Sequence, residues 1–141
     1  MNLRYSIDWM RHAVRFTAED LLMRTELSLA AFEMSTVPMI FQDGRGLVDF
    51  GAVTEVGART DDLVFFLISL NKLARAKVAV VVPAGKASDL VVEAIRAVGL
   101  RQVRFFGCEA EALEWLNEGV ATDRLLAATS KQSQSLSEAT E

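Results

Sequence analysis

Apolar and polar residues alternate at the start of the chain, which predicts a pair of strands before any helix. Within residues 3–8, Leu3, Tyr5 and Ile7 occupy every second position, as in a strand that buries one face. A second alternation covers residues 13–16, after a connection too long for a two-residue turn. The two segments therefore predict an antiparallel pair of strands.

The next segment has the features of a helix start. Thr17 stands where an N-cap is expected, because acids at positions 19 and 20 would fall in the first turn and stabilise its free N–H groups. The pattern predicts a helix from Thr17 to about Met34 with one buried stripe. The stripe consists of Leu21, Leu22, Thr25, Leu29 and Phe32.

The segment from Ser35 to Arg59 is interrupted by turn signals at Pro38, Asp43-Gly44 and Gly46. Its best strand candidate is residues 47–50. An alternative interpretation makes residues 39–41 and 47–48 the two arms of a hairpin over Asp43-Gly44.

The second half of the chain alternates helices and strands. Thr60, followed by two aspartates, predicts a helix that is capped by its hydroxyl and runs to about Arg75. The Val- and Ala-rich stretch at 77–82, closed by proline, predicts a strand buried on both faces. The remaining elements are a helix capped by Ser88 and ended by Gly99, a strand over 102–106, and a helix over 109–118 ended by Gly119.

This order predicts an α/β fold: a mixed, mostly parallel sheet of about five strands with about four helices on both faces. With 141 residues, the chain has the size of one domain. We assign residues 1–119 to that domain and residues 120–141 to a polar C-terminal tail.

The composition of the chain limits the kinds of binding partner that it is expected to have. Nineteen acids and fifteen Lys and Arg, without a basic block, argue against nucleic acid. The longest apolar run, residues 63–68, is far shorter than the roughly 18–20 residues that cross a bilayer. The N-terminus lacks the apolar core and cleavage site of a secretory signal, so a cytoplasmic location is expected.

Several segments resemble the STAS-like, or SpoIIAA-like, group of small bacterial domains, whose fold is shared with anti-sigma factor antagonists and related to lipid-binding SEC14 domains. They are residues 5–8, 17–21, 47–50, 78–83, and 103–106 followed by 111–116. The last pair is the most specific, because an aromatic-ended strand followed by a helix with Ala-Leu-x-Trp-Leu is an unusual combination. The resemblance implies a regulatory domain. Where such antagonists carry a phosphorylated serine at the second helix start, Thr60 is the residue that could stand in here.

The second predicted helix has more apolar surface than one sheet face can cover. Leu63, Phe66, Leu67, Leu70 and Leu73 already complete a core stripe. Further apolar groups at 64, 65 and 68 imply a second burial partner: a neighbouring helix, a second subunit, a protein partner or an apolar ligand. The predicted interaction surface consists of Thr60, Asp61, Val64, Phe65 and Ile68.

The loop at residues 85–88 is a possible anion or ligand site. Gly85, Lys86 and Ser88 lie between a predicted strand and a helix N-terminus, where α/β folds often hold anions. A phosphate loop also needs a glycine five residues before Gly85, and Val80 stands there.

Catalytic, metal and cofactor motifs are missing from the sequence. His12 has no nucleophile placed beside it, and the single cysteine, Cys108, has no partner for a disulfide or a zinc site. The aspartates at 43, 49, 61 and 62 lack metal-binding spacing. We therefore predict a non-enzymatic domain without cofactor that binds a protein partner or forms a homodimer. The alternative, implied by the SEC14 relationship, is a carrier or sensor of a small apolar, lipid-like ligand.

Overall fold

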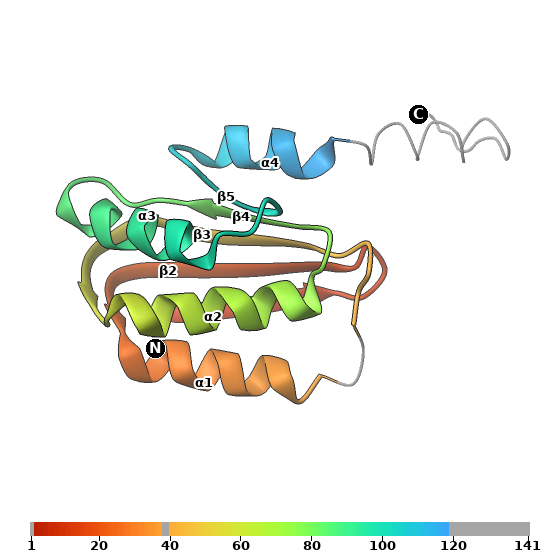
Figure 1. Cartoon of the computed structure of the whole chain (residues 1–141), viewed down its shortest axis with the longest axis horizontal. Coiled ribbons are helices and arrows are strands. Elements are labelled where there is room, and N and C mark those ends of the chain that lie inside the picture. The colour runs from red at the N-terminus through yellow and green to blue at the C-terminus, as the bar shows by residue number, and fades with distance from the viewer. Residues whose placement is uncertain (1, 38–39, 119–141) are drawn as a thin grey trace, which may run out of the picture.

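The computed structural model describes residues 2–37 and 40–118 and contains one five-stranded sheet with four helices (Figure 1). The strands are β1 (Leu3–Asp8), β2 (Ala13–Met23), β3 (Arg45–Gly57), β4 (Lys77–Val81) and β5 (Val103–Phe106). The helices are α1 (Arg24–Ser35), α2 (Thr60–Leu73), α3 (Lys86–Val98) and α4 (Glu109–Asn117).

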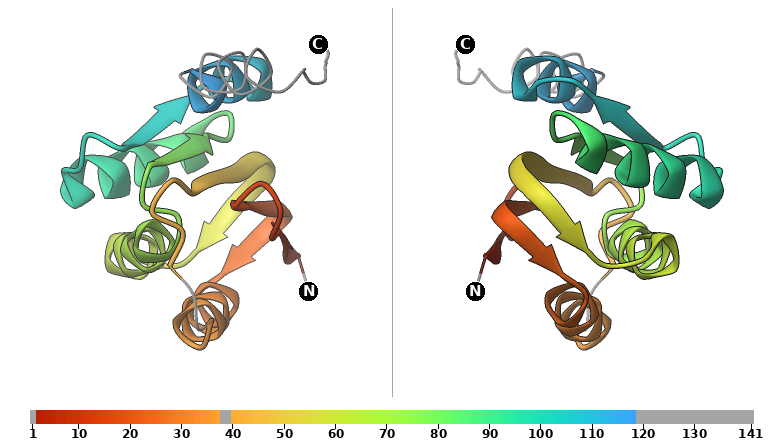
Figure 2. Two further views of the ribbon diagram at one scale, coloured as in Figure 1. Left: turned by 90° about the vertical axis from the view of Figure 1, so that its right-hand side faces the viewer. Right: turned by 90° about the vertical axis from the view of Figure 1, so that its left-hand side faces the viewer.

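The sheet follows the order of the chain, β1-β2-β3-β4-β5. β1 and β2 are antiparallel, and the three pairings from β2 to β5 are parallel. Successive crossovers of one hand that step in one direction place their helices on the same face of a sheet. Accordingly α1, α2 and α3 cover one face, and α2 lies between the other two (Figures 1 and 2). The predicted α/β fold class is confirmed.

The larger core lies between these three helices and the sheet. It buries Phe16 of β2, Phe50 of β3 and Phe66 of α2, and the Phe66 ring meets the Phe16 ring edge-on at 5.0 Å. Within β4, residues 78–81 are all buried, as predicted for a strand covered on both sides. Because each large core aromatic comes from a different element, this core holds the layers together.

Among the described residues, α4 is the helix that covers the opposite face of the sheet (Figure 2). Trp115 and Leu116 pack there on Ala79 and Val81. The end of the helix is bound by strand residues, because Arg45 Nε donates to the Leu116 carbonyl at 2.8 Å and Lys77 Nζ donates to the Trp115 carbonyl at 2.7 Å. These bonds satisfy carbonyls that the last turn of a helix leaves free.

The prediction that a helix begins at Thr17 is wrong, because β2 continues to Met23. The alternation of buried residues continues past Phe16, and two register shifts then interrupt the pairing with β3. At these shifts Asp20 adopts a φ of 58°. The acids that suggested a first helical turn are therefore exposed residues of an irregular strand.

The predicted buried stripe of the first helix is wrong, because a different side of the helix faces the core. The helix buries Leu27, Ala30, Ala31 and Met34, whereas Leu29 and Phe32 are exposed. Its first turn is held by Glu26, a buried carboxylate that accepts the backbone N–H groups of Asn2 at 2.6 Å and Leu3 at 3.0 Å. Glu26 thus joins the helix to β1.

Strand residues 47–50 are confirmed as part of the longer β3, which pairs with β2 and β4. This pairing rules out the alternative hairpin, since residues 47–48 lie opposite those two strands. The two predicted hydroxyl caps are also wrong. Thr60 is the first residue of α2 and Ser88 the third residue of α3, each one or more places past the true caps, Arg59 and Gly85.

Other predicted boundaries agree closely with the structure. Gly99 ends α3 in the left-handed conformation, with its N–H bonded to the Ile95 carbonyl. α4 buries Ala112, Trp115 and Leu116, but Leu113, predicted to be buried, is 38% exposed. The predicted stop at Gly119 and the tail at 120–141 lie outside the described residues. Within the described ranges, none of the helices has the length and apolarity to cross a membrane.

Candidate functional site

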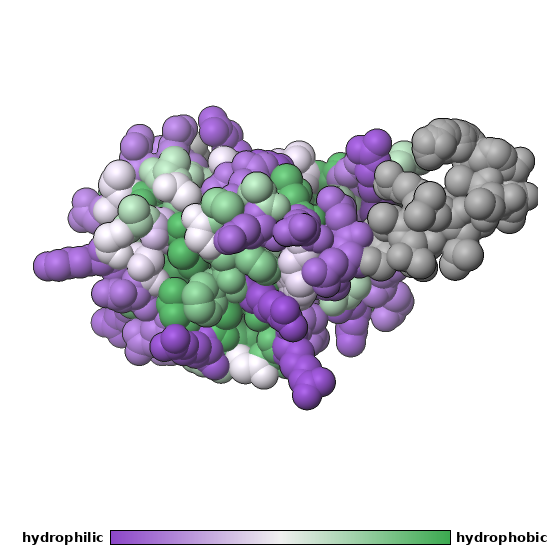
Figure 3. Space-filling model, turned by 90° about the horizontal axis from the view of Figure 1, so that it is seen from above, coloured by the Kyte–Doolittle hydropathy of each residue, from purple (hydrophilic) through white to green (hydrophobic). Residues whose placement is uncertain are grey.

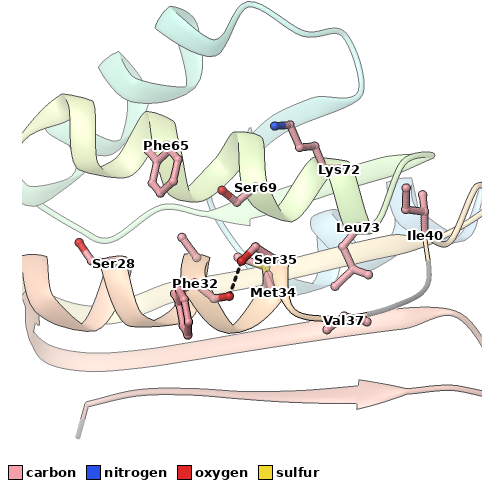
Figure 4. A pocket seen from close by; sticks show the side chains of 11 residues that line it. Ser28, Phe32, Met34, Ser35, Val37, Ile40, Phe65, Ser69, Lys72 and Leu73 are labelled. Carbon is pink, nitrogen blue, oxygen red and sulfur yellow. Dashed lines mark hydrogen bonds between the residues drawn. The ribbon is translucent and has the colours of Figure 1, made fainter.

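An apolar groove runs between the outer sides of α1 and α2, and its cavity volume is about 520 Å³ (Figure 4). Its floor is formed by buried residues of both helices, including Ala31, Met34 and Leu73. The small side chain of Ala31 leaves room between the two helices. The groove is therefore built by the same packing that closes the larger core.

Three large apolar side chains line the groove while remaining in contact with solvent. Phe32 of α1 is 66% exposed, Phe65 of α2 is 61% exposed, and Ile40, which precedes β3, is 55% exposed. Figure 4 shows Phe32 and Phe65 on the two helices that flank the groove. Single exposed apolar residues are ordinary, whereas several gathered around one hollow form the kind of apolar patch that is common at binding surfaces.

The polar groups that the described residues bring to the groove are three serines and one lysine. Ser35 Oγ donates to the Phe32 carbonyl at 2.6 Å, so this hydroxyl is engaged by its own helix. Ser28, Ser69 and Lys72 complete the polar lining. Among the described residues, the lining contains no histidine or carboxylate to act as a general base. The groove can therefore hold apolar groups, but its lining supplies no base to activate a serine.

The predicted interaction surface is divided between two sides of α2. Phe65 lines the groove, whereas Val64 packs against the larger core. Thr60 lies toward α3, where its Oγ1 donates to Glu93 Oε1 at 3.4 Å. Asp61 is exposed and Ile68 half-buried on the outer side. Much of the surplus apolar surface of α2 is thus covered by its neighbours, α1 and α3, one of the predicted alternatives.

The environment of Thr60 is acidic. A phosphate on its hydroxyl would lie beside Glu93 as well as next to Asp61 in sequence. Both carboxylates would repel an added dianion, although the helix N-terminus would attract it. The local charges therefore oppose a phosphorylation switch at this residue.

The loop at residues 85–88 joins β4 to α3. Gly85 caps the helix with a φ of 70°, a conformation that glycine adopts without strain. The backbone N–H of Ser88 donates to the Gly85 carbonyl at 3.2 Å, so that donor is already used. Lys86 is exposed at the first position of α3.

A second hollow, with a volume of about 330 Å³, is lined by α4 and by residues from the end of β1 and the starts of β2 and β3. Three arginines line it, at positions 11, 15 and 45. Each has a partner within the protein: Asp8 for Arg11, Glu109 for Arg15 and the Leu116 carbonyl for Arg45. Figure 3 shows the molecule from the α4 side, where apolar residues reach the surface among many hydrophilic ones.

His12 and Asp43 form a close pair near the start of β2. His12 Nδ1 lies 2.7 Å from Asp43 Oδ1, and the imidazole ring stacks on Phe41 with ring centroids 4.6 Å apart. The hydrogen bond with His12 holds the pKa of the Asp43 carboxyl below its ordinary value of 3.8. This pair joins the β1–β2 connection to the segment before β3.

Replacing Asp43 with asparagine should remove a pH-dependent part of the stability. Because the folded pKa of Asp43 is lowered, its ionised form stabilises the fold above pH 3.8 and the contribution is lost as pH falls through the lowered pKa. Urea unfolding of both proteins at neutral and acidic pH measures the effect, which we expect to be below about 1 kcal/mol because the pair is partly exposed. A difference that widens at low pH would contradict this assignment.

The described residues contain no group of three or more His, Cys, Asp and Glu side chains that could hold a metal ion. Cys108 is exposed immediately before α4. Three of the four aspartates named in the sequence analysis have separate partners: Asp43 contacts His12, Asp49 accepts the Gly51 N–H, and Asp62 accepts the Arg59 N–H.

Comparison with known proteins supports the fold. No family model and no curated protein matches the chain. Among solved structures, an uncharacterized protein of the DUF3478 family from Shewanella loihica PV-4, described as having a SpoIIAA-like fold, matches with a TM-score of 0.52 and 17% identity. The match covers 81% of this chain and 91% of the other. The chain has a SpoIIAA-like fold. The resemblance seen in the sequence is thereby confirmed at the level of the fold.

The groove of this SpoIIAA-like domain was only partly visible in its sequence. The sequence predicts Phe65 on the contact surface but assigns Phe32 to the core stripe, and it gives no signal for Ile40, Ser69 and Lys72. The sequence signal for the orientation of Phe32 is the order of small and large residues on α1. Because Ala30 and Ala31 are the buried positions, Phe32 is directed away from the sheet.

Proposed function

We propose that the chain is a non-enzymatic regulatory domain that binds a protein partner through the groove between α1 and α2. The observation that carries the proposal is the exposure of Phe32, Phe65 and Ile40 around one hollow. Aromatic residues set in a partly enclosed pocket are frequent anchors of protein–protein interfaces. A groove between two helices suits an apolar helix face or a set of apolar side chains.

The chemistry of the groove favours binding over catalysis. Among the described lining residues, the hydroxyls have no general base, and the cation, Lys72, lies at the C-terminal end of α2. The SpoIIAA-like fold is compatible with this role but does not by itself assign it.

Replacing Phe65 with glutamate should abolish partner binding while leaving the domain folded. A buried charge without a partner would disfavour the complex, whereas an exposed one costs the free domain little. The measurement is quantitative affinity capture from host extract, compared with Phe105→Glu as the control. Phe105 is 42% exposed on the edge strand β5, away from the groove. Equal capture by all three proteins would overturn the proposal.

A second candidate function is binding of a small apolar ligand. The groove volume of about 520 Å³ lies within the range of about 300–1,000 Å³ typical of ligand sites. Native mass spectrometry of protein purified from its host distinguishes the two functions. A lipid-sized adduct that is absent from Phe65→Glu supports a carrier, and its absence in both proteins favours the interaction domain.

A further inference from the structure

The outer side of α2 carries opposite charges at its two ends with apolar groups between them. Asp61 lies in the first turn and Lys72 in the last turn, and both are exposed. At about 100° per residue, positions 61, 65, 68 and 72 fall on one side of the helix. Among the described residues, neither Asp61 nor Lys72 takes part in an ion pair. This surface has the charge pattern of a self-complementary interface.

The positions of these residues are symmetric about one point. Midway between Asp61 and Lys72 lies the peptide that joins Phe66 and Leu67, and Phe65 and Ile68 lie equally far on either side of it. A two-fold axis level with this point, lying in the contact plane outside α2 and perpendicular to the helix, would run α2 antiparallel to its copy. Each Asp61 would then face a Lys72 of the second copy, and each Phe65 would face an Ile68.

We propose that a second copy of this chain is the partner that covers the groove, through antiparallel pairing of α2 in a two-fold dimer. This inference rests on the proposed function and names the partner of that site. The same rotation sets α1 of one copy opposite α1 of the other, so the two grooves and their Phe32 side chains are brought together. An interface that contacts itself in this way is the common form of homodimer.

The charges on α2 determine whether parallel or antiparallel pairing of the two helices is more favourable. Parallel pairing of α2 would place Asp61 beside Asp61 and Lys72 beside Lys72, which is unfavourable for both pairs. Antiparallel pairing forms two opposite-charge contacts per dimer. An unrelated partner would need no such symmetry within α2, so the symmetric placement of charge and apolar groups favours a second copy.

The test uses the charge reversals D61K and K72D, separately and mixed. Each single variant places like charges together twice in its own dimer, so its dissociation constant should rise about 10-fold or more at low salt. A mixture of the two variants should form a heterodimer of near wild-type affinity, because both contacts are then between opposite charges. Sedimentation equilibrium of the full chain at low ionic strength measures the dissociation constants of wild type, of each variant alone and of the mixture.

The mixed sample also controls for folding. Lysine at position 61 opposes the helix dipole and weakens α2 in every sample that contains it, so recovery on mixing cannot arise from altered folding. A wild-type chain that stays monomeric, single variants that dimerise as well as wild type, or a mixture without recovery would each overturn the dimer. Capture of another protein that depends on Phe65 would then leave the proposed function standing.

Discussion

Phe66→Ala should lower the free energy of unfolding by about 3–5 kcal/mol, the usual cost of removing a buried phenylalanine side chain. Phe66 is fully buried and contacts the rings of Phe16 at 5.0 Å and Phe50 at 6.4 Å between ring centroids. Its ring therefore joins α2 to two neighbouring strands. A domain of this size has a total stability of about 5–15 kcal/mol, so the variant should be close to unfolding. Urea unfolding followed by circular dichroism measures the loss.

The adjacent residue supplies a matched control. Phe65→Ala removes the same side chain from a position that is 61% exposed and should change the stability of dilute protein by no more than about 0.5 kcal/mol. Similar losses at the two positions would mean that α2 is rotated relative to the sheet, and the assignment of the groove would fail with it.

Trp115→Ala should be the second most destabilising change, at about 3–5 kcal/mol. Trp115 is the central contact of α4 on its sheet face, where its ring lies 5.5 Å from the Phe106 ring. Lys77 Nζ lies 4.9 Å from the Trp115 ring, and Arg104 Cζ lies 5.1 Å from it. Cations at such distances add to the stabilisation from apolar burial. Loss of the ring should therefore release α4 from the sheet.

Thermal unfolding and hydrogen exchange of the α4 amides measure this effect. Leu113→Ala, on the exposed side of the same helix, is the control and should leave the exchange of α4 nearly unchanged. If Trp115→Ala exchanges no faster than Leu113→Ala within 109–117, α4 is held by its backbone bonds to Arg45 and Lys77 rather than by its tryptophan.

Most of the fold could be predicted because its signals are local. Three local signals each predict a helix or strand of the correct type: the Val-rich run before Pro83, the glycine at 99 and the Trp-containing block at 111–116. Their order then limits the topology to parallel crossovers.

The predictions from the sequence are wrong where a tertiary contact overrides the local preference of the residues. Thr17 with two following acids is typical of a helix start, yet the segment is paired with β3 as a strand that ends at Met23. Glu26 was not expected to be buried, because its partners are the N–H groups of residues 2 and 3, far away in the sequence. Long-range pairings of this kind leave no periodic pattern.

The candidate groove could be predicted only in part, because one of its walls depends on tertiary packing. The sequence of the second helix shows a surplus of apolar residues, and Phe65 is one of those predicted to lie on the contact surface. The second wall of the groove depends on how α1 is rotated, which is set by the packing of Ala30 and Ala31 beneath it. That rotation could not be read from the residues of α1 alone.

The most direct test of the groove as a contact surface is oxidative footprinting of phenylalanine side chains, in buffer at a protein concentration too low for dimers of the chain and in host extract at a concentration that allows them. We expect labelling of Phe32 and Phe65 to fall in the extract relative to labelling of Phe105, whose exposed ring serves as the internal reference. The ratio corrects for radical scavenging by the extract. Unchanged ratios for both groove residues would contradict the account.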